Sequence, residues 1–331
     1  MNCFRSVLVA VALGVAAGVS SASPYSGLVI FGDSLSDRGN LALAIGADPG
    51  QVITGNGYIP DQPYASGQFS NGDVWAKTFA TALGFGSAAT PSLAGGSDYA
   101  FGGARMATDG AGLPPSLNTQ TSMYLGAQGS ADGNALYVIE GGGNDARDAL
   151  FAAATSADPF TSIMASALAF AQATGDVVDR LQAAGAQHIV VWDVPNLGTA
   201  PVVTSQGAGA SYLGTQVALA MNAALSARLS GETGVSIFDF FGLEDDFVAR
   251  PGFYGLLNVS DACGASPSCD PSTSLFWDGI HPTSTGHALL ARGMLAAVGL
   301  PEPATWALVL SGLVLLRRRR GVAEGRAYRP R

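Results

Sequence analysis

The sequence predicts an α/β fold in which a parallel sheet carries helices on both faces. Short apolar and β-branched runs alternate along the chain with longer segments of helical composition, which is the pattern of βαβ units. Hydrophobic residues make up 48% of the 331 residues and charged residues only 12%, so the chain can bury a large core and is not disordered. We find no internal repeat and no interdomain linker.

The expected strands are short, and three of them end at a glycine-rich turn that carries a polar residue. The first apolar run covers residues 28–31, and the later strands are expected at residues 99–103, 135–139, 188–192 and 235–240. Ligands of parallel sheets collect at the carboxyl ends of the strands. The turns that follow the strands should therefore meet at one edge of the sheet.

Helices are expected between these strands and at the end of the domain. Their predicted ranges are residues 74–83, 163–184, 212–229 and 286–298. Residues 46–72 are rich in Gly, Pro, Asn and Gln and are expected to form a long loop. Long loops in compact domains are often functional.

The N-terminus has the pattern of a secretory signal peptide. Arg5 precedes an apolar run at residues 7–19, and the small residues that follow predict cleavage after Ala22. We therefore expect a signal peptide at residues 1–22, removed by signal peptidase. A buried first helix is the alternative.

The C-terminal segment, residues 301–331, is expected to be a second sorting segment. Pro-Glu-Pro at 301–303 precedes an apolar stretch at 304–316 and four arginines at 317–320. This order resembles the PEP-CTERM signal of Gram-negative bacteria. The resemblance implies transient anchoring in the inner membrane, cleavage by an exosortase and delivery to the cell envelope or extracellular matrix. An uncleaved membrane anchor is the alternative.

The remaining body, residues 23–300, is expected to be one domain. It holds eight basic and 23 acidic residues, a net charge of −15, so it is a poor candidate for binding nucleic acid. Cys263 and Cys269 lie six positions apart, and in an oxidising compartment we expect them to form a disulfide. A metal site there is not favoured, because no second Cys or His pair lies nearby.

The chemistry predicted for this body is attack by a serine. Ser34 follows the first strand within Gly-Asp-Ser-Leu, and a serine hydroxyl needs a base to attack an acyl carbon. His281 is the candidate base, because Asp278 three residues earlier can hold its Nδ1–H and leave Nε2 for the serine. We expect His188 to be structural and His287 to be a surface or capping residue, since neither has such a partner.

Acyl transfer also needs hydrogen-bond donors for the oxyanion. The candidates are the backbone N–H groups of Ser34 and Gly103 and the side-chain amide of Asn144. A glycine lets the backbone approach a substrate closely. Taken alone, a glycine at a strand end is usually a plain turn.

These residues together resemble the four blocks of the GDSL, or SGNH, hydrolase family. The blocks are Gly32–Leu35, Gly103, Gly142–Asp145 and Asp278–Pro282, in the family's order. The segments at 67–75 and 193–198 are similar to its lipase/esterase branch, and the resemblance covers nearly all of residues 28–298. It implies a three-layer α/β/α sandwich with a flavodoxin-like parallel sheet, the SGNH hydrolase fold. It also implies ester hydrolysis without a metal or cofactor, with Ser34 as nucleophile, His281 as base and Asp278 as its partner.

Three residues depart from the family pattern, and none belongs to the predicted chemistry. Gln68 stands where Arg is frequent, Asp98 where Asn is common, and Glu140 where an apolar residue is usual. We expect Asp37 and Asn40 to hold the turn after the serine and the start of the following helix. The predicted substrate is an ester, whether a lipid, a short-chain ester or an acetylated polysaccharide. A lipase, phospholipase or polysaccharide deacetylase with the same site, and a non-catalytic matrix or glycan-binding protein on this fold, remain alternatives.

Overall fold

The structure is a computed structural model, and it describes residues 23–48, 50–57, 64–112 and 114–299. The signal peptide predicted at residues 1–22 and the sorting signal predicted at residues 301–331 lie outside these ranges. Within the described residues, no helix is both long enough and apolar enough to span a membrane.

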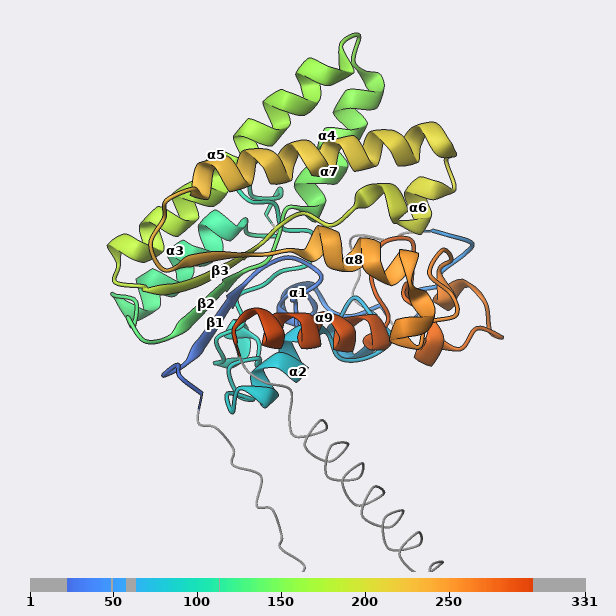
Figure 1. Cartoon of the computed structure of the whole chain (residues 1–331). Helices are drawn as coiled ribbons and strands as arrows, with labels where there is room; N and C mark the ends of the chain where they lie inside the picture. Colours follow the sequence, from blue (N-terminus) through green and yellow to red (C-terminus); the bar gives the residue numbers. More distant parts are fainter. Residues whose placement is uncertain (1–22, 49, 58–63, 113, 300–331) are drawn as a thin grey trace, which may run out of the picture. The chain divides into compact units, whose positions relative to one another are not determined.

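A parallel four-stranded sheet lies at the centre of the body (Figure 1). The strands stand side by side in chain order, with Leu28, Leu136 and His188 in register at the start of the first three. Their bounds are β1 (Leu28–Phe31), β2 (Leu136–Ile139), β3 (His188–Trp192) and β4 (Val235–Phe238). This confirms the α/β prediction. The strands β1 and β3 begin and end at the residues that the sequence predicted.

The segment expected as a strand at residues 99–103 is not a regular strand. Instead, residues 97–101 run beside β1 on the side away from β2, joined by three backbone hydrogen bonds. Ile30 N–H donates to Ser97 O (3.0 Å), Tyr99 N–H to Ile30 O (2.7 Å) and Phe101 N–H to Gly32 O (3.1 Å). Counted in chain order, this edge segment and the four strands have the flavodoxin-like order 2-1-3-4-5. Two glycines and the turn at Ala104 end the pairing too early for a strand.

Helices cover both faces of the sheet, and several of them were not predicted. The helix expected to start near Asn40 is α1 (Asn40–Ile45). The unpredicted helices are α3 (Leu117–Gln128), α4 (Gly143–Thr155), α6 (Pro201–Thr204) and α8 (Phe240–Ala249). The predicted helices are α2 (Trp75–Ala82), α5 (Pro159–Ala183), α7 (Ala208–Leu229) and α9 (Ser284–Ala297). The prediction of a strand to residue 240 is wrong, because Asp239 caps α8 by accepting a hydrogen bond from Gly242 N–H.

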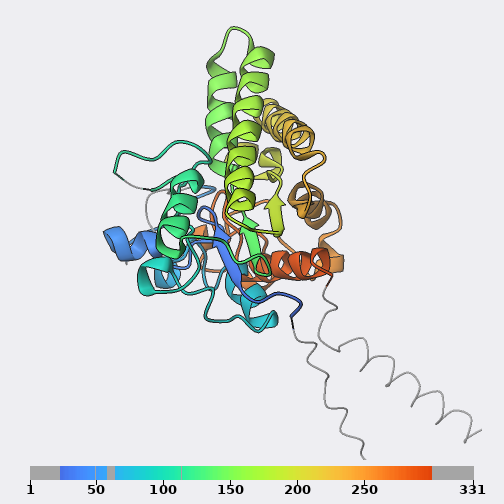
Figure 2. The same ribbon diagram turned by 90° about the vertical axis from the view of Figure 1, so that its left-hand side faces the viewer.

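Each face of the sheet packs against its own hydrophobic core. Alternate strand residues such as Phe31 and Tyr137 face the core shared with α3, α4, α5 and α7. Their neighbours Ile30 and Val138 face the core shared with α2, α8 and α9. Because side chains alternate along a strand, both faces of β1 and β2 are buried, whereas the edge strand β4 is exposed at Ser236 and Ile237. Helices on both faces give the predicted three-layer sandwich (Figures 1 and 2).

Candidate active site

Ser34 lies in a tight turn directly after β1. Asp33 shapes this turn, because its backbone oxygen accepts the N–H groups of Ser36 (3.2 Å) and Asp37 (2.9 Å). Its carboxylate accepts the N–H of Leu35 (3.0 Å). The serine is therefore held at the carboxyl end of the first strand, as the sequence indicated.

His281 and Asp278 come from the turn before α9 and complete a line of hydrogen bonds to the serine. Asp278 Oδ2 lies 2.6 Å from His281 Nδ1, and His281 Nε2 lies 2.8 Å from Ser34 Oγ. The second oxygen of Asp278 accepts the backbone N–H groups of Ile280 (2.7 Å) and His281 (2.6 Å). The carboxylate thus fixes both the backbone and the ring of the histidine.

The protonation state of Asp278 follows from these contacts. Burial alone would raise the pKa of Asp278. The charge of His281 and the hydrogen bonds from residues 280 and 281 lower it by a larger amount, so the pKa lies below its usual value. The carboxylate is therefore ionised at neutral pH. An ionised partner stabilises the imidazolium that forms when the histidine accepts a proton.

Two aromatic side chains from the predicted long loop flank the histidine ring. The ring centroid of Phe69 lies 5.2 Å from that of His281, and the Tyr64 ring lies 6.0 Å away at a steep angle. The sequence predicted that this loop would be functional, but not that it would pack against the predicted base. Packing on the ring limits its rotation and keeps Nε2 toward the serine.

The three predicted oxyanion donors differ in their surroundings. Among the described residues, the N–H groups of Ser34 and Gly103 have no acceptor. Asn144, at the start of α4, donates from Nδ2 to Ala104 O (3.0 Å) and to a carboxylate oxygen of Asp33 (3.3 Å). The asparagine is therefore held next to Gly103, and its longer hydrogen bond must yield for it to reach a ligand.

Buried carboxyl groups lie beneath the serine turn, two of them at the departures from the family pattern. Glu140 accepts the N–H of Asp33 (3.3 Å) and the hydroxyl of Ser36 (2.8 Å), and Ser36 in turn accepts Trp75 Nε1–H (3.0 Å). Asp98 accepts the N–H of Ala100 (3.0 Å). Burial raises the pKa of Glu140 and of Asp98 well above the usual range.

Asp37 and Asn40 hold the chain after the serine, as expected. Asp37 accepts four backbone N–H groups, including that of Gly102 (2.8 Å), and Asn40 Nδ2 donates to the carbonyl groups of Asp98 (2.8 Å) and Ala100 (2.9 Å). These bonds tie the serine turn to the edge segment that leads to Gly103. The third departure, Gln68, is also buried and accepts the N–H of Val74 (3.1 Å).

His287 is not a surface or capping residue, so that prediction is wrong. Its side chain is fully buried in the first turn of α9, and neither ring nitrogen has a hydrogen-bond partner in the described part of the chain. Burial, together with the nearby His281, lowers its pKa to about 3, so the ring is neutral. The cap of α9 is Thr283, whose hydroxyl accepts the N–H of Gly286 (3.0 Å).

A small pocket of about 50 Å³ opens on Ser34 and His281. Its walls include Asn144, Ile280 of the Asp278–Pro282 block, and two residues that the sequence did not single out for this site, Ala200 and Glu244. Glu244 comes from α8, and burial raises its pKa to about 8, so its carboxyl group is neutral at pH 7. Among the described residues, its Oε2 has no hydrogen-bond partner.

A larger, mostly apolar cavity of about 470 Å³ adjoins this pocket. The two share Gly143, Asn144, Leu197 and Ile280. From there the cavity extends between α4 and the α6–α7 region, and its walls include Leu150, Phe151, Ala154, Val202, Val203 and Leu213. An apolar cavity therefore shares a wall with the pocket of Ser34.

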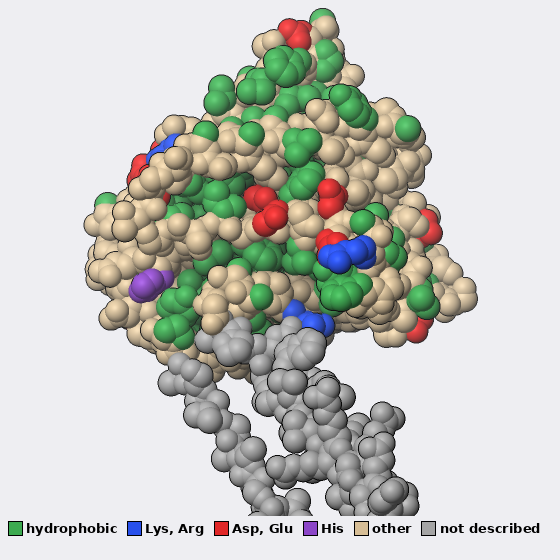
Figure 3. Space-filling view, viewed as in Figure 1, with side chains coloured by type: hydrophobic (Ala, Val, Ile, Leu, Met, Phe, Trp, Pro, Cys, Tyr) green, Lys and Arg blue, Asp and Glu red, His purple; other side chains and the backbone are tan. Residues whose placement is uncertain are grey.

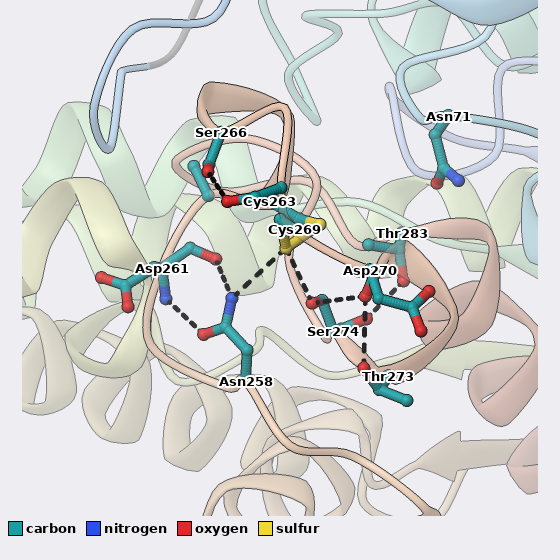
Figure 4. Close-up of a disulfide and its surroundings, with 12 residues drawn as sticks. Asn71, Asn258, Asp261, Cys263, Ser266, Cys269, Asp270, Thr273, Ser274 and Thr283 are labelled. Carbon is teal, nitrogen blue, oxygen red and sulfur yellow. Dashed lines mark hydrogen bonds between the residues drawn. A yellow bond between two sulfur atoms is a disulfide. The ribbon is translucent and has the colours of Figure 1, made fainter.

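The loop before the Asp278 turn is braced by a disulfide between Cys263 and Cys269, as the sequence led us to expect (Figure 4). Inside this loop, Ser274 Oγ donates to Asp270 O (2.9 Å), and Thr283 Oγ1 donates to Ser274 O (2.6 Å). The backbone N–H of Cys263 donates to Phe276 O (3.0 Å). The disulfide loop thus supports the strand-like residues that carry Asp278.

No group of three or more His, Cys, Asp or Glu side chains within the described ranges has the geometry of a metal site.

Gly103, although predicted as an oxyanion donor together with Ser34 and Asn144, is absent from the walls of the serine pocket. It has φ +82°, a left-handed conformation that favours glycine.

The chain matches a known protein family and several known proteins. A family model described as GDSL-like Lipase/Acylhydrolase matches residues 28–294. Esterase EstA of Pseudomonas aeruginosa is 30% identical over 87% of this chain and 48% of its own length. The chain spans about half the length of the Pseudomonas relatives that it matches.

Other similar proteins carry other activities in their names. A phosphatidylcholine-sterol acyltransferase of Aeromonas hydrophila is 24% identical, over 87% of this chain and 94% of its own length. Among solved structures, phospholipase A1 of Streptomyces albidoflavus is 19% identical with a TM-score of 0.42, covering 82% of this chain and 99% of its own.

Proposed function

Because the chain belongs to the GDSL-like lipase/acylhydrolase family, we propose that it hydrolyses carboxylic esters through a covalent acyl-enzyme on Ser34. One observation carries this proposal. The carboxylate of Asp278, the ring of His281 and the hydroxyl of Ser34 form one unbroken line of hydrogen bonds, 2.6 Å and 2.8 Å long. A serine so connected has a base in place for its proton.

The proposed reaction has two halves. Ser34 Oγ attacks the ester carbonyl carbon while its proton moves to His281 Nε2, and the alcohol leaves with that proton as the C–O bond breaks. Water then gives a proton to His281 and attacks the acyl carbon. The acid leaves, and the proton returns to Ser34. Asp278 orients the ring and balances its positive charge in both halves.

The developing oxyanion would be bound by three donors. The N–H groups of Ser34 and Gly103 are available because no described residue accepts them. Asn144 Nδ2 would exchange its long bond to Asp33 for the oxyanion. Each such donor contributes about 3 kcal/mol to the transition state in comparable sites.

The apolar cavity favours a lipase or phospholipase over a polysaccharide deacetylase. On the acyl side of the ester a deacetylase needs room only for an acetyl group, whereas the cavity that adjoins the serine pocket has about 470 Å³ and mostly apolar walls. A profile of activity against acyl-chain length, with an acetylated polysaccharide included, separates these functions. We expect rates to rise with chain length and the polysaccharide to be a poor substrate.

Labelling with a fluorophosphonate probe, followed by peptide mass spectrometry, tests the nucleophile. We expect one adduct, on Ser34, with none in His281→Ala and no ester turnover in Ser34→Ala. Full activity of a folded Ser34→Ala variant would refute the assignment. Glycan binding that survives in Ser34→Ala, with no hydrolysis by the unmodified chain, would instead support a binding protein on this fold.

We also propose that the protein is exported. The signal-peptide pattern at residues 1–22 and the PEP-CTERM-like order at 301–331 support this, and a disulfide persists most readily outside the cytoplasm. Signal peptidase and an exosortase would be its processing partners, and the envelope or matrix its destination. Cell fractionation with mass spectrometry of both termini tests the proposal; intact ends in a cytoplasmic fraction would refute it.

A further inference from the structure

We propose that the outer end of the α4–α5 hairpin docks the enzyme on an uncharged or zwitterionic lipid surface, so that an acyl chain can enter the cavity beside Ser34. The inference deepens the proposed function by naming the physical form of the substrate, and the assignment of Ser34 underlies it. Three features of the hairpin carry it: exposed apolar side chains, the scarcity of charge at its outer end, and continuity with the site.

The hairpin projects beyond the rest of the body in both ribbon views (Figures 1 and 2). Phe151 lies one turn before the end of α4, and Phe160 lies in the first turn of α5, so both are close to the connecting loop. Their side chains are 73% and 72% exposed. Met164 and Leu168 continue the Phe160 position along α5 at intervals of four, and Leu168 is 61% exposed.

These side chains do not belong to the hydrophobic core of the body. The buried face of α5 is formed by other residues, among them Ile163, Ala167 and Phe170. Apolar side chains gather over this end of the molecule in the space-filling view (Figure 3). Exposed apolar patches of this kind mark surfaces that meet another molecule or a membrane.

The outer end of the hairpin is also poor in charge, although Arg147 on the inner part of α4 lines the cavity. Between Asp148 and Asp176 there is one charged residue, Asp158, and its carboxylate caps α5 by accepting the N–H (3.2 Å) and hydroxyl (2.7 Å) of Thr161. The segment offers no lysine or arginine for anionic headgroups, and the body carries −15. A neutral or zwitterionic lipid surface is therefore the occupant that fits, because binding rests on apolar burial and not on charge.

The patch is continuous with the catalytic pocket. One wall of the apolar cavity follows α4 from Gly143, beside Ser34, to Ala154 near the hairpin end. At the rise of an α-helix this path is about 16 Å long. Phe151 belongs both to the exposed patch and to the cavity wall. An acyl chain leaving a lipid layer at the hairpin would thus lie along an apolar wall that leads to the pocket of Ser34.

The chain offers a matched control for this patch. Phe253 and Leu257 are equally large and exposed, at 76% and 84%, but they lie after α8 and not on the hairpin. The guanidinium of Arg250 lies 5.3 Å from the Phe253 ring centroid. Large apolar side chains are therefore exposed at both sites. Only the hairpin site is poor in charge and adjoins the apolar cavity.

A local fluorescence reporter tests docking in the full chain. In a Cys3→Ser background, Phe160→Cys or Phe253→Cys is labelled with an environment-sensitive dye and titrated with phosphatidylcholine vesicles. Apolar segments at the chain ends are common to both variants, so they cannot produce a difference. We expect a blue shift with a several-fold rise in emission at position 160 and little change at 253.

A second measurement links docking to turnover. The variant Phe160→Ser/Met164→Ser/Leu168→Ser is compared with Phe253→Ser/Leu257→Ser on one fluorogenic long-chain ester in vesicles and on one soluble short ester. Losing the burial of even one large apolar side chain weakens binding about tenfold, so we expect at least that loss on vesicles for the hairpin variant. The soluble ester should be hydrolysed normally by both.

Three outcomes would overturn the docking proposal. They are equal dye responses at 160 and 253, unchanged vesicle turnover in the hairpin variant, and a response at 160 that depends on protein concentration without vesicles, which would indicate a second copy as the partner. Failure of the proposed function looks different. The unmodified chain would then hydrolyse neither ester, while the dye at position 160 would still report whether the hairpin enters the lipid.

Discussion

The serine turn and the outer end of the α4–α5 hairpin are built in opposite ways. Around Ser34, polar groups are buried and paired: Asp33, Asp37 and Glu140 together accept hydrogen bonds from backbone groups on several segments. On the hairpin, large apolar side chains such as Phe160 are exposed and make no part of the core. The first region fixes atoms within hydrogen-bond distances, and the second is suited to a fluid surface that needs no fixed geometry.

After loss of the serine itself, the largest expected effect comes from breaking the fixed region at Asp278. In Asp278→Ala the ring of His281 loses its orienting acceptor and its balancing charge, so kcat on a soluble ester should fall about 10⁴-fold. The exposed Asp261→Ala in the disulfide loop is the control and should retain activity. Stopped assays with p-nitrophenyl butyrate measure both. A loss below tenfold would mean that the serine is activated by another group.

Removing an oxyanion donor should have a smaller effect. Asn144→Ala deletes one of three donors, and we expect kcat to fall about 10²–10³-fold with little change in KM, since the donor acts on charge that develops in the transition state. Asn134→Ala, on an exposed loop, is the control. If KM rises instead and kcat does not change, Asn144 binds the ground state and is not an oxyanion donor.

The sequence predicted most of the fixed region because its chemistry is local. Asp278 and His281 are three residues apart, and Ser34 follows a strand whose end the apolar run marks clearly. The surrounding residues could not be predicted in the same way. Glu244 reaches the pocket only because α8 packs there. The helix α8 begins after the capping residue Asp239, inside a segment whose composition predicts a strand.

The same reasoning explains the error at His287. A histidine near the start of a helix often caps it or faces water, but Thr283 is the cap here. His287 then falls on the face of α9 that contacts the core. Which face of a helix is buried depends on tertiary packing, and residues 286–298 contain too many small apolar residues to mark it.

Raising the pH should lower the stability of the folded chain through its buried carboxyl groups, and not through the exposed hairpin. Folding raises the pKa of Glu244 to about 8 and also raises the pKa values of Glu140 and Asp98, so between the unfolded and folded values of each group the folded state holds more protons and stability falls as pH rises. His287, with a folded pKa of about 3, acts in the opposite direction, but only below its unfolded value of 6.5. From pH 6.5 to 8 we therefore expect the melting temperature to fall.

Variants at the two regions sharpen this pH test. Glu140→Gln keeps the side-chain shape without a titrating group and should flatten the decline measured by thermal unfolding. The carboxyl of Asp158 on the hairpin is exposed and lies outside this network, so Asp158→Asn should leave the slope unchanged. A melting temperature that rises from pH 6.5 to 8 would show that the buried carboxyl groups ionise without cost.

The smallest expected effect is on the hairpin itself. Phe160→Ala removes an exposed side chain and should change the free energy of unfolding by no more than about 0.5 kcal/mol. Phe170→Ala, ten residues along the same helix and 3% exposed, should cost about 3–5 kcal/mol. Urea titrations of both variants compare the two faces of α5 directly. If Phe160→Ala is as destabilising as Phe170→Ala, the hairpin end is a structural part of the core, and its exposed face is not free to meet a lipid surface.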